Sequence, residues 1–140
     1  EEQRLDLYKR IALIDSEEGR DEMLDELIDR FGEPSRSVQN LLFIAMLRME
    51  AHKAFVTDIV QRPEEIVFTL FERAAIDASG IPAVIEKNKP YVTFTADAKH
   101  PAFHYFYKKN SRIKPKDLPD LVMTFVKELQ GLALNQKSEN

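Results

Sequence analysis

Residues 26–42 read ELIDRFGEPSRSVQNLL and predict the end of one helix, a tight turn and the start of another helix. Gly32 stands where a helix commonly ends, because glycine adopts a positive φ without a Cβ clash. Pro34 lacks the amide proton that a continuing helix needs. The next helix is expected to begin near Ser35 to Ser37. The stretch therefore predicts two helices joined by a short turn.

Helical periodicity continues on both sides of this turn. Apolar residues at helical spacing predict a first helix over residues 4–14 and place Leu27 and Phe31 of the second helix in a core. Residues 15–19 break the pattern between them. The third helix is expected to run to about Lys53 and to be the most buried, since apolar residues surround it.

After residue 53 the hydrophobic period changes to two, which is typical of strands. Strands are expected over residues 55–60, 66–71, 91–95 and 103–107. A helix over residues 77–88, capped by Ser79 or Gly80, separates the two strand pairs, and a last helix is capped by Asp117.

This order predicts an α+β fold, with three N-terminal helices followed by a ββαββα unit. The sheet is expected to have four strands and to be mainly antiparallel. We expect residues 1–140 to form a single domain, residues 135–140 to be a frayed tail, and the chain to be a piece of a longer polypeptide.

Composition excludes several classes of site. The chain has no cysteine, which excludes disulfides, thiolate zinc sites and a cysteine nucleophile. Its four glycines lie too far apart for a phosphate-binding loop, so we expect no cofactor in this chain. No apolar run approaches the ~18 residues of a membrane span, and we expect a cytoplasmic protein with no membrane partner.

Charge is unevenly spread along the chain. The net charge is −4, but residues 1–33 carry 12 acidic and 5 basic residues, whereas residues 34–140 carry 12 acidic and 15 basic. Such asymmetry favours charged docking surfaces.

Candidate chemistry is sparse. His100 and His104 have a metal-like spacing only on a helix, and the pattern around Pro101 predicts a turn and a strand instead. The acidic pairs of the second helix are expected to be a solvated face, and a small enzyme using carboxylates stays an alternative that needs a cleft with a raised carboxyl pKa.

A second alternative is a nucleic-acid-binding module. Aromatic residues of the strand over 103–107 precede a loop with five basic residues and one acidic residue, and aromatics beside cations can stack bases and bind phosphates. The basic residues are Lys108, Lys109, Arg112, Lys114 and Lys116. The competing interpretation is that the alternate aromatics form core and the lysines a solvated loop.

Residues 26–42 also resemble the C-terminal domain of the bacterial transcription-repair coupling factor, a family that carries Glu-Leu-Ile-Asp-Arg-Phe-Gly, a proline-containing loop and a Val-x-Asn-Leu-Leu helix start. The stretches around residues 4–11 and 44–47 are similar to the family's first and third helices. The close match covers residues 3–53, and only the order of elements agrees beyond it. Pro34 lies earlier in the loop than the family's prolines.

The resemblance implies a non-catalytic regulatory domain of an ATP-driven DNA translocase. In that family the domain docks on an N-terminal UvrB-like module, masks the UvrA-binding surface and restrains the motor until RNA polymerase is engaged. ATP and magnesium would act in motor domains outside this chain, and DNA would be contacted only through those domains.

The charged turn is the expected partner-facing surface. Its residues are Asp29, Arg30, Glu33, Pro34 and Arg36. Gly32 and Pro34 would fix the turn, so its charged groups would lose little entropy on docking. The alternative is that Asp29 and Arg30 form only a helix-terminal ion pair, worth less than ~1 kcal/mol.

Overall fold

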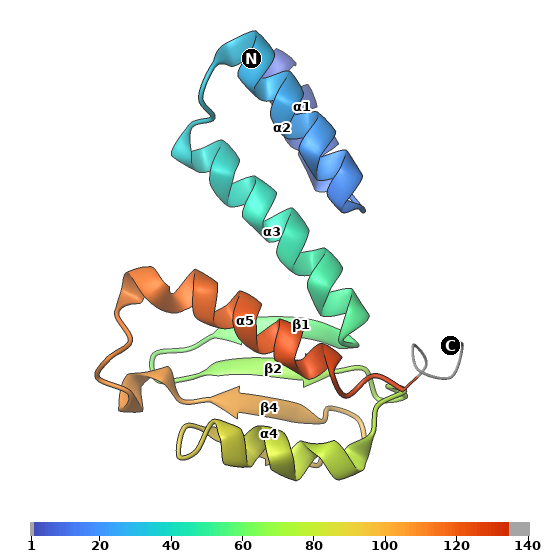
Figure 1. Cartoon of the computed structure of the whole chain (residues 1–140), viewed down its shortest axis with the longest axis vertical. Helices are drawn as coiled ribbons and strands as arrows, with labels where there is room; N and C mark the ends of the chain where they lie inside the picture. The colour runs from blue at the N-terminus through green and yellow to red at the C-terminus, as the bar shows by residue number, and fades with distance from the viewer. Residues whose placement is uncertain (1, 135–140) are drawn as a thin grey trace. The chain divides into compact units, whose positions relative to one another are not determined.

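In the part of the chain that the structure describes, three helices precede the sheet in sequence, one lies between its second and third strands, and one follows it (Figure 1). The structure is a computed structural model that describes residues 2–134, so the expected frayed tail lies outside the described residues. The helices are α1 (Glu2–Ala12), α2 (Glu17–Phe31), α3 (Arg36–Lys53), α4 (Ile81–Lys87) and α5 (Leu118–Gln130). The strands are β1 (Val56–Gln61), β2 (Ile66–Leu70), β3 (Val92–Thr95) and β4 (Ala102–Tyr105).

The predicted α+β class is confirmed. All three strand pairings are antiparallel, and the spatial order is β1-β2-β4-β3. The chain divides into two compact units, residues 1–49 and 50–140, with the division inside α3. We call them the helical unit and the sheet unit. The expectation of a single domain stays a prediction.

Capping residues set the helix ends in the helical unit. The Ser16 hydroxyl accepts a hydrogen bond from the Gly19 amide (2.9 Å) and begins α2. Gly32 ends α2 with φ 80° and ψ −155°, a conformation open essentially only to glycine, and its amide donates to the Ile28 carbonyl (2.9 Å). The predicted turn is therefore confirmed.

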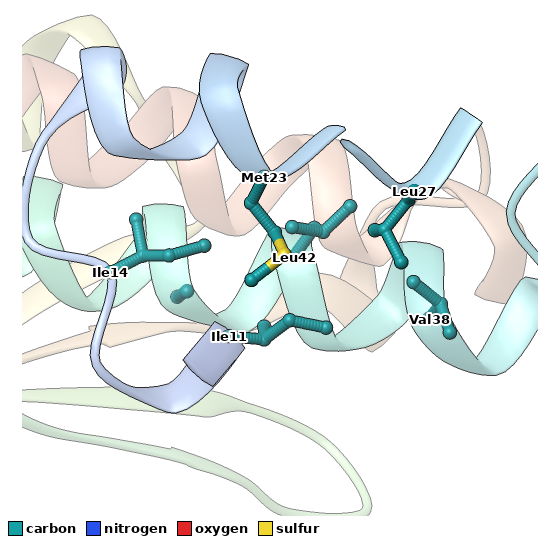
Figure 2. Packing of buried hydrophobic residues seen from close by; sticks show 7 residues of the cluster. Ile11, Ile14, Met23, Leu27, Val38 and Leu42 are labelled. Carbon is teal, nitrogen blue, oxygen red and sulfur yellow. The ribbon is translucent and has the colours of Figure 1, made fainter. Parts of the chain in front are cut away.

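The core of the helical unit is small and aliphatic (Figure 2). It consists of Ile11, Ile14, Met23, Leu27, Val38, Leu42 and Ala45. The prediction that Phe31 belongs to this core is wrong, because 57% of its surface is exposed. Its partner Leu27, one turn earlier, is buried as predicted.

The third helix is not the most buried one, contrary to our prediction. Ile44 is 55% exposed and Leu41 is 36% exposed, since only one face of α3 meets α1 and α2 in the core. The most extensively buried helix is α5, which buries Leu118, Val122, Phe125, Val126 and Leu129.

Aromatic residues fill the core of the sheet unit. Phe68 of β2 and Phe103 of β4 face each other in register and are fully buried. The Phe125 ring of α5 lies 4.8 Å from the Phe68 ring and 5.8 Å from the Phe103 ring. The helix therefore seals one face of the sheet.

One predicted strand and one predicted helix have a 3₁₀ turn at one end, and one predicted cap has another role. Strand β4 ends at Tyr105 rather than residue 107, because Tyr107 enters a 3₁₀ turn over Tyr107–Lys109. The helix predicted over 77–88 begins with a 3₁₀ turn, Ala78–Gly80, so that Gly80 is the cap of α4 as expected. Asp117 does precede α5, but its carboxylate accepts from the Lys114 amide (2.9 Å) instead of capping α5.

Candidate docking surface and basic loop

The charged turn joins α2 to α3 in the helical unit. Asp29 and Arg30 lie in the last turn of α2, Glu33 and Pro34 in the connection, and Arg36 opens α3. All are exposed except Pro34, which is half-buried. The Pro34 carbonyl accepts a hydrogen bond from the Gln39 side chain (3.1 Å), which ties the turn to α3. The structure thus places the five predicted residues on one ordered connection.

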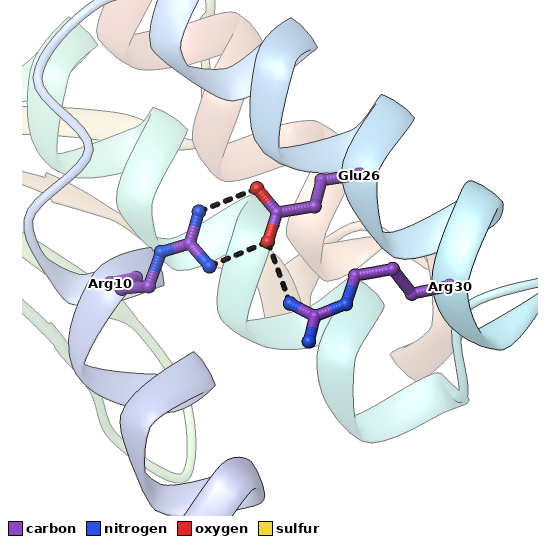
Figure 3. Close-up of polar contacts among 3 residues, drawn as sticks. All are labelled: Arg10, Glu26 and Arg30. Atoms are coloured by element: carbon purple, nitrogen blue, oxygen red, sulfur yellow. Dashed lines mark hydrogen bonds and ion pairs between the residues drawn. The ribbon is translucent and has the colours of Figure 1, made fainter.

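A three-residue ion network fixes one side of this turn (Figure 3). The Arg10 guanidinium of α1 donates to both carboxylate oxygens of Glu26, at 2.6 and 2.7 Å. Arg30 donates to the same carboxylate at 3.1 Å, one helical turn away. Because Arg10 and Glu26 lie on different helices, the network joins α1 to α2.

The network shifts the pKa values of Glu26 and Arg10. The bidentate hydrogen bonds from Arg10, and then the bond from Arg30, lower the pKa of Glu26 to about 2. The carboxylate in turn raises the pKa of Arg10. Arg30 therefore pairs with Glu26, not with Asp29 as the helix-terminal alternative supposed.

An open groove of about 590 Å³ borders the turn. Its walls include Leu7, Tyr8, Leu27 and Val38, with Phe31 and Pro34 from the turn itself. The guanidinium of Arg30 lies 5.6 Å from the centre of the Phe31 ring. The turn thus presents an aromatic ring and a cation side by side, next to a groove lined by both apolar and polar residues.

The residues of the alternative site lie in the sheet unit. Phe103 and Tyr107 are buried, and Tyr105 is half-buried with its ring 5.5 Å from Phe125. These three aromatic side chains belong to the core of the sheet unit. They therefore cannot stack on nucleic-acid bases as the alternative supposed. The side chains of all five basic residues of 108–116 are exposed, and none forms an ion pair within residues 2–134.

The histidine of β4 has protein partners on both ring nitrogens. His104 Nδ1 lies 2.6 Å from the Glu65 carboxylate and Nε2 lies 2.9 Å from the Thr95 hydroxyl. Over the described part of the chain there is no group of three potential metal ligands and no helix long and apolar enough to cross a membrane.

Sequence comparison assigns the chain to a family. The model of the TRCF domain matches residues 1–81, which include all of the helical unit and the first strand pair. The chain belongs to the TRCF domain family. The resemblance carried by residues 26–42 is thereby confirmed.

Relatives extend this result. The chain is 32% identical to the transcription-repair-coupling factor of Bacillus subtilis (strain 168) over 78 residues, 56% of the chain and 7% of the relative. It is 26% identical to the Escherichia coli (strain K12) factor over 131 residues, 94% of the chain and 11% of the relative. The chain thus spans about a tenth or less of the length of these relatives.

A solved structure described as the C-terminal domain of transcription-repair coupling factor has the same fold. It aligns with a TM-score of 0.75 at 20% identity, over 100% of this chain and 84% of that one. This likeness covers the sheet unit, which lies largely outside the family match.

The sequence did not indicate two residues that contact the charged turn through Arg30. Arg10 and Glu26 belong to helices that looked independent, and no local spacing joins residues 16 positions apart. There was one weak indication in the sequence that Phe31 is exposed, because Phe31 directly precedes Gly32, where the helix ends.

Proposed function

We propose that this TRCF domain is a non-catalytic regulatory module that docks on the UvrB-like module of its parent protein, in transcription-coupled nucleotide-excision repair in the bacterial cytoplasm. Docked, it masks the UvrA-binding surface and restrains the ATP-dependent DNA translocase. ATP and magnesium act on other domains of the parent, which also move along the DNA duplex, and UvrA and RNA polymerase are indirect partners. Membership of the TRCF family supports the proposal.

The observation that carries it is the composition of the turn between α2 and α3. Phe31 is 57% exposed beside the groove, although aromatic side chains of this size are usually buried. Arg30 lies over its ring and is held by Glu26. Aromatic residues and arginines are enriched at protein interfaces, where they contribute most of the binding energy.

The turn is also preorganised. Gly32 fixes its entry, the Gln39 side chain holds the Pro34 carbonyl, and the Arg10–Glu26–Arg30 network holds α2 against α1. A docking surface that is already ordered loses little entropy on binding. Tethering within one polypeptide supplies an effective concentration that reaches the millimolar range, so a modest polar interface suffices and remains releasable.

The test is binding of the 140-residue chain to the purified UvrB-like module of its parent. Arg36→Glu and Phe31→Ala are the informative variants, because neither side chain takes part in the Glu26 network. We expect each to weaken docking about tenfold or more, by charge reversal and by loss of an aromatic contact respectively. In the intact factor, both variants should expose the UvrA-binding surface and raise the basal ATPase rate.

Arg20→Glu is the matched control, since Arg20 lies near the opposite end of α2 and pairs only with Asp21 among the described residues. It should dock like the wild type. If both informative variants keep wild-type circular dichroism, docking and ATPase, the turn is not the docking surface. The isolated chain should show no saturable ATP turnover, and such turnover would refute the non-catalytic role.

A further inference from the structure

We propose that the sheet unit carries a second binding surface, for single-stranded nucleic acid, made of the His104 and Phe106 rings and the basic loop of residues 108–116. The ligand class is a polyanion with unpaired bases. The proposal is independent of docking by the turn between α2 and α3, which lies in the other unit.

Among the described residues of the sheet unit, α4 and α5 leave one face of the sheet uncovered. Helices α4 and α5 both lie in front of the sheet in Figure 1, and Asn88 at the end of α4 donates to Glu128 of α5 (3.0 Å). Phe103 points toward α5, so its neighbour His104 points to the opposite face. There His104 stands beside its register partners Val67 of β2 and Thr93 of β3.

The two rings on this face are already oriented. His104 is held by Glu65 and Thr95 through its two ring nitrogens. The Phe106 ring is nearly parallel to it, at 19° and 6.2 Å between centres, and the Phe106 amide donates to the Tyr91 carbonyl (2.8 Å). The Lys109 ammonium lies 4.8 Å from the centre of the Phe106 ring. Aromatic faces next to a cation are the elements that stack bases in single-strand binding proteins.

The basic loop that follows is fixed by its backbone. The Tyr107 hydroxyl donates to the Arg62 carbonyl (2.5 Å), and the Lys108 amide donates to the Glu64 carbonyl (3.3 Å). Further along, the Arg112 amide donates to the Asn110 side chain (3.0 Å). These hydrogen bonds hold the backbone of the loop and so position its basic side chains.

The positive charge of the loop is not neutralised by ion pairs within the described residues. Asp117, the acidic residue that closes the segment, accepts the Lys114 backbone amide, and within residues 2–134 no salt bridge involves Lys108, Lys109, Arg112, Lys114 or Lys116. Closely spaced unpaired cations attract phosphates, and release of condensed counterions makes such binding salt-dependent. An acidic protein segment would bind the basic side chains but would not need the His104 and Phe106 rings. The effect of removing a ring therefore distinguishes a nucleic acid from an acidic protein partner.

The experiment is fluorescence anisotropy of the full 140-residue chain with a labelled oligothymidylate of about 20 nucleotides and with a duplex of the same length. We expect saturable binding to the single strand that weakens as salt rises, and weaker binding to the duplex, whose bases are already stacked. Lys109→Glu with Arg112→Glu should weaken single-strand binding tenfold or more, and Phe106→Ala about tenfold, whereas Phe106→Tyr should retain it.

Arg73→Glu with Lys99→Glu is the charge-matched control, because both residues are exposed and lie in the connections at the opposite end of the sheet, after β2 and before β4. It should bind like the wild type, and all variants should keep wild-type circular dichroism. Absence of saturable binding to the single strand would overturn the proposal. Equal binding of polyglutamate together with no effect of Phe106→Ala would overturn it in favour of an acidic protein partner.

Discussion

The helical unit and the sheet unit bury their apolar residues in different ways. The helical unit packs aliphatic side chains and alanine at one seam among three helices, and leaves Phe31, Ile44 and Leu13 exposed. The sheet unit packs Phe68, Phe103 and Phe125 into a fully sealed layer. Aromatic side chains bury more area each, so the sheet unit gains more hydrophobic stabilisation from each contact.

The two units also differ in the groups that they expose. The helical unit carries the ion network and exposes Phe31 beside Arg30, which fits the docking role proposed for it. The sheet unit has the larger buried core and a basic loop that follows β4, at one end of the sheet. We expect substitutions to affect the two units unequally, and the predictions below run from the largest expected effect to the smallest.

Phe125→Ala should destabilise the sheet unit by about 3–5 kcal/mol, because Phe125 is 2% exposed and contacts three other aromatic rings. Urea unfolding followed by circular dichroism measures the loss, and hydrogen exchange locates it. Protection should fall over the sheet unit and persist in α1 and α2. Equal loss of protection in both units would mean that the chain unfolds as one cooperative block.

Leu42→Ala should cost about 2–5 kcal/mol in the helical unit, because Leu42 is 8% exposed at the centre of its aliphatic core (Figure 2). Hydrogen exchange should lose protection first in α1, α2 and the first part of α3. Ile44→Ala is the matched control on the same helix, since Ile44 is 55% exposed. A loss in Leu42→Ala below about half a kilocalorie, as surface substitutions give, would contradict this packing.

Gly32→Ala should destabilise the turn by about 1–3 kcal/mol. No atom lies within 4 Å of the added Cβ, so the cost comes from the positive φ alone. Gly131→Ala is the control for the backbone conformation, because its φ of −63° suits any residue and its added Cβ brings only a close contact of 3.2 Å with the Glu128 carbonyl oxygen. Urea midpoints of the two variants compare the effects, and an equal midpoint shift would contradict a backbone origin.

The smallest effect concerns pH. The pKa of Glu26 is about 2 in the folded chain, below the ~4.3 of an unperturbed glutamate, so the unfolded state binds more protons between these values. The stabilisation by this carboxylate is present above about pH 4.3 and is lost as pH falls toward 2. Glu26→Gln should therefore show a shallower loss of stability than the wild type in this window.

Urea midpoints measured between pH 5 and about pH 2 test this difference. Asp25→Gln is the control, because Asp25 lies on the exposed face of the same helix, whereas Arg10 and Arg30 both pair with Glu26. Identical slopes in the wild type and in Glu26→Gln would mean that the network does not persist in solution.

Local patterns determined most of the elements. Helical spacing, Gly32 and Pro34 predict the turn between α2 and α3, because φ preference and the missing proline amide act within a few residues. Alternation of apolar and polar residues predicts all four strands, because successive side chains of a strand point to opposite faces of the sheet. The errors lie at Tyr107 and residue 77, where 3₁₀ turns replace the ends of a predicted strand and helix.

Only the tertiary structure decided which side chains are buried and which groups meet. The sequence makes α3 apolar nearly all round, yet α5 is the most extensively buried helix, because burial depends on which elements pack against a face. The Arg10–Glu26 pair and the contacts of His104 with Glu65 and Thr95 join residues on separate elements. Such pairs carry no local signature, since their geometry arises only when long-range packing brings helices and strands together.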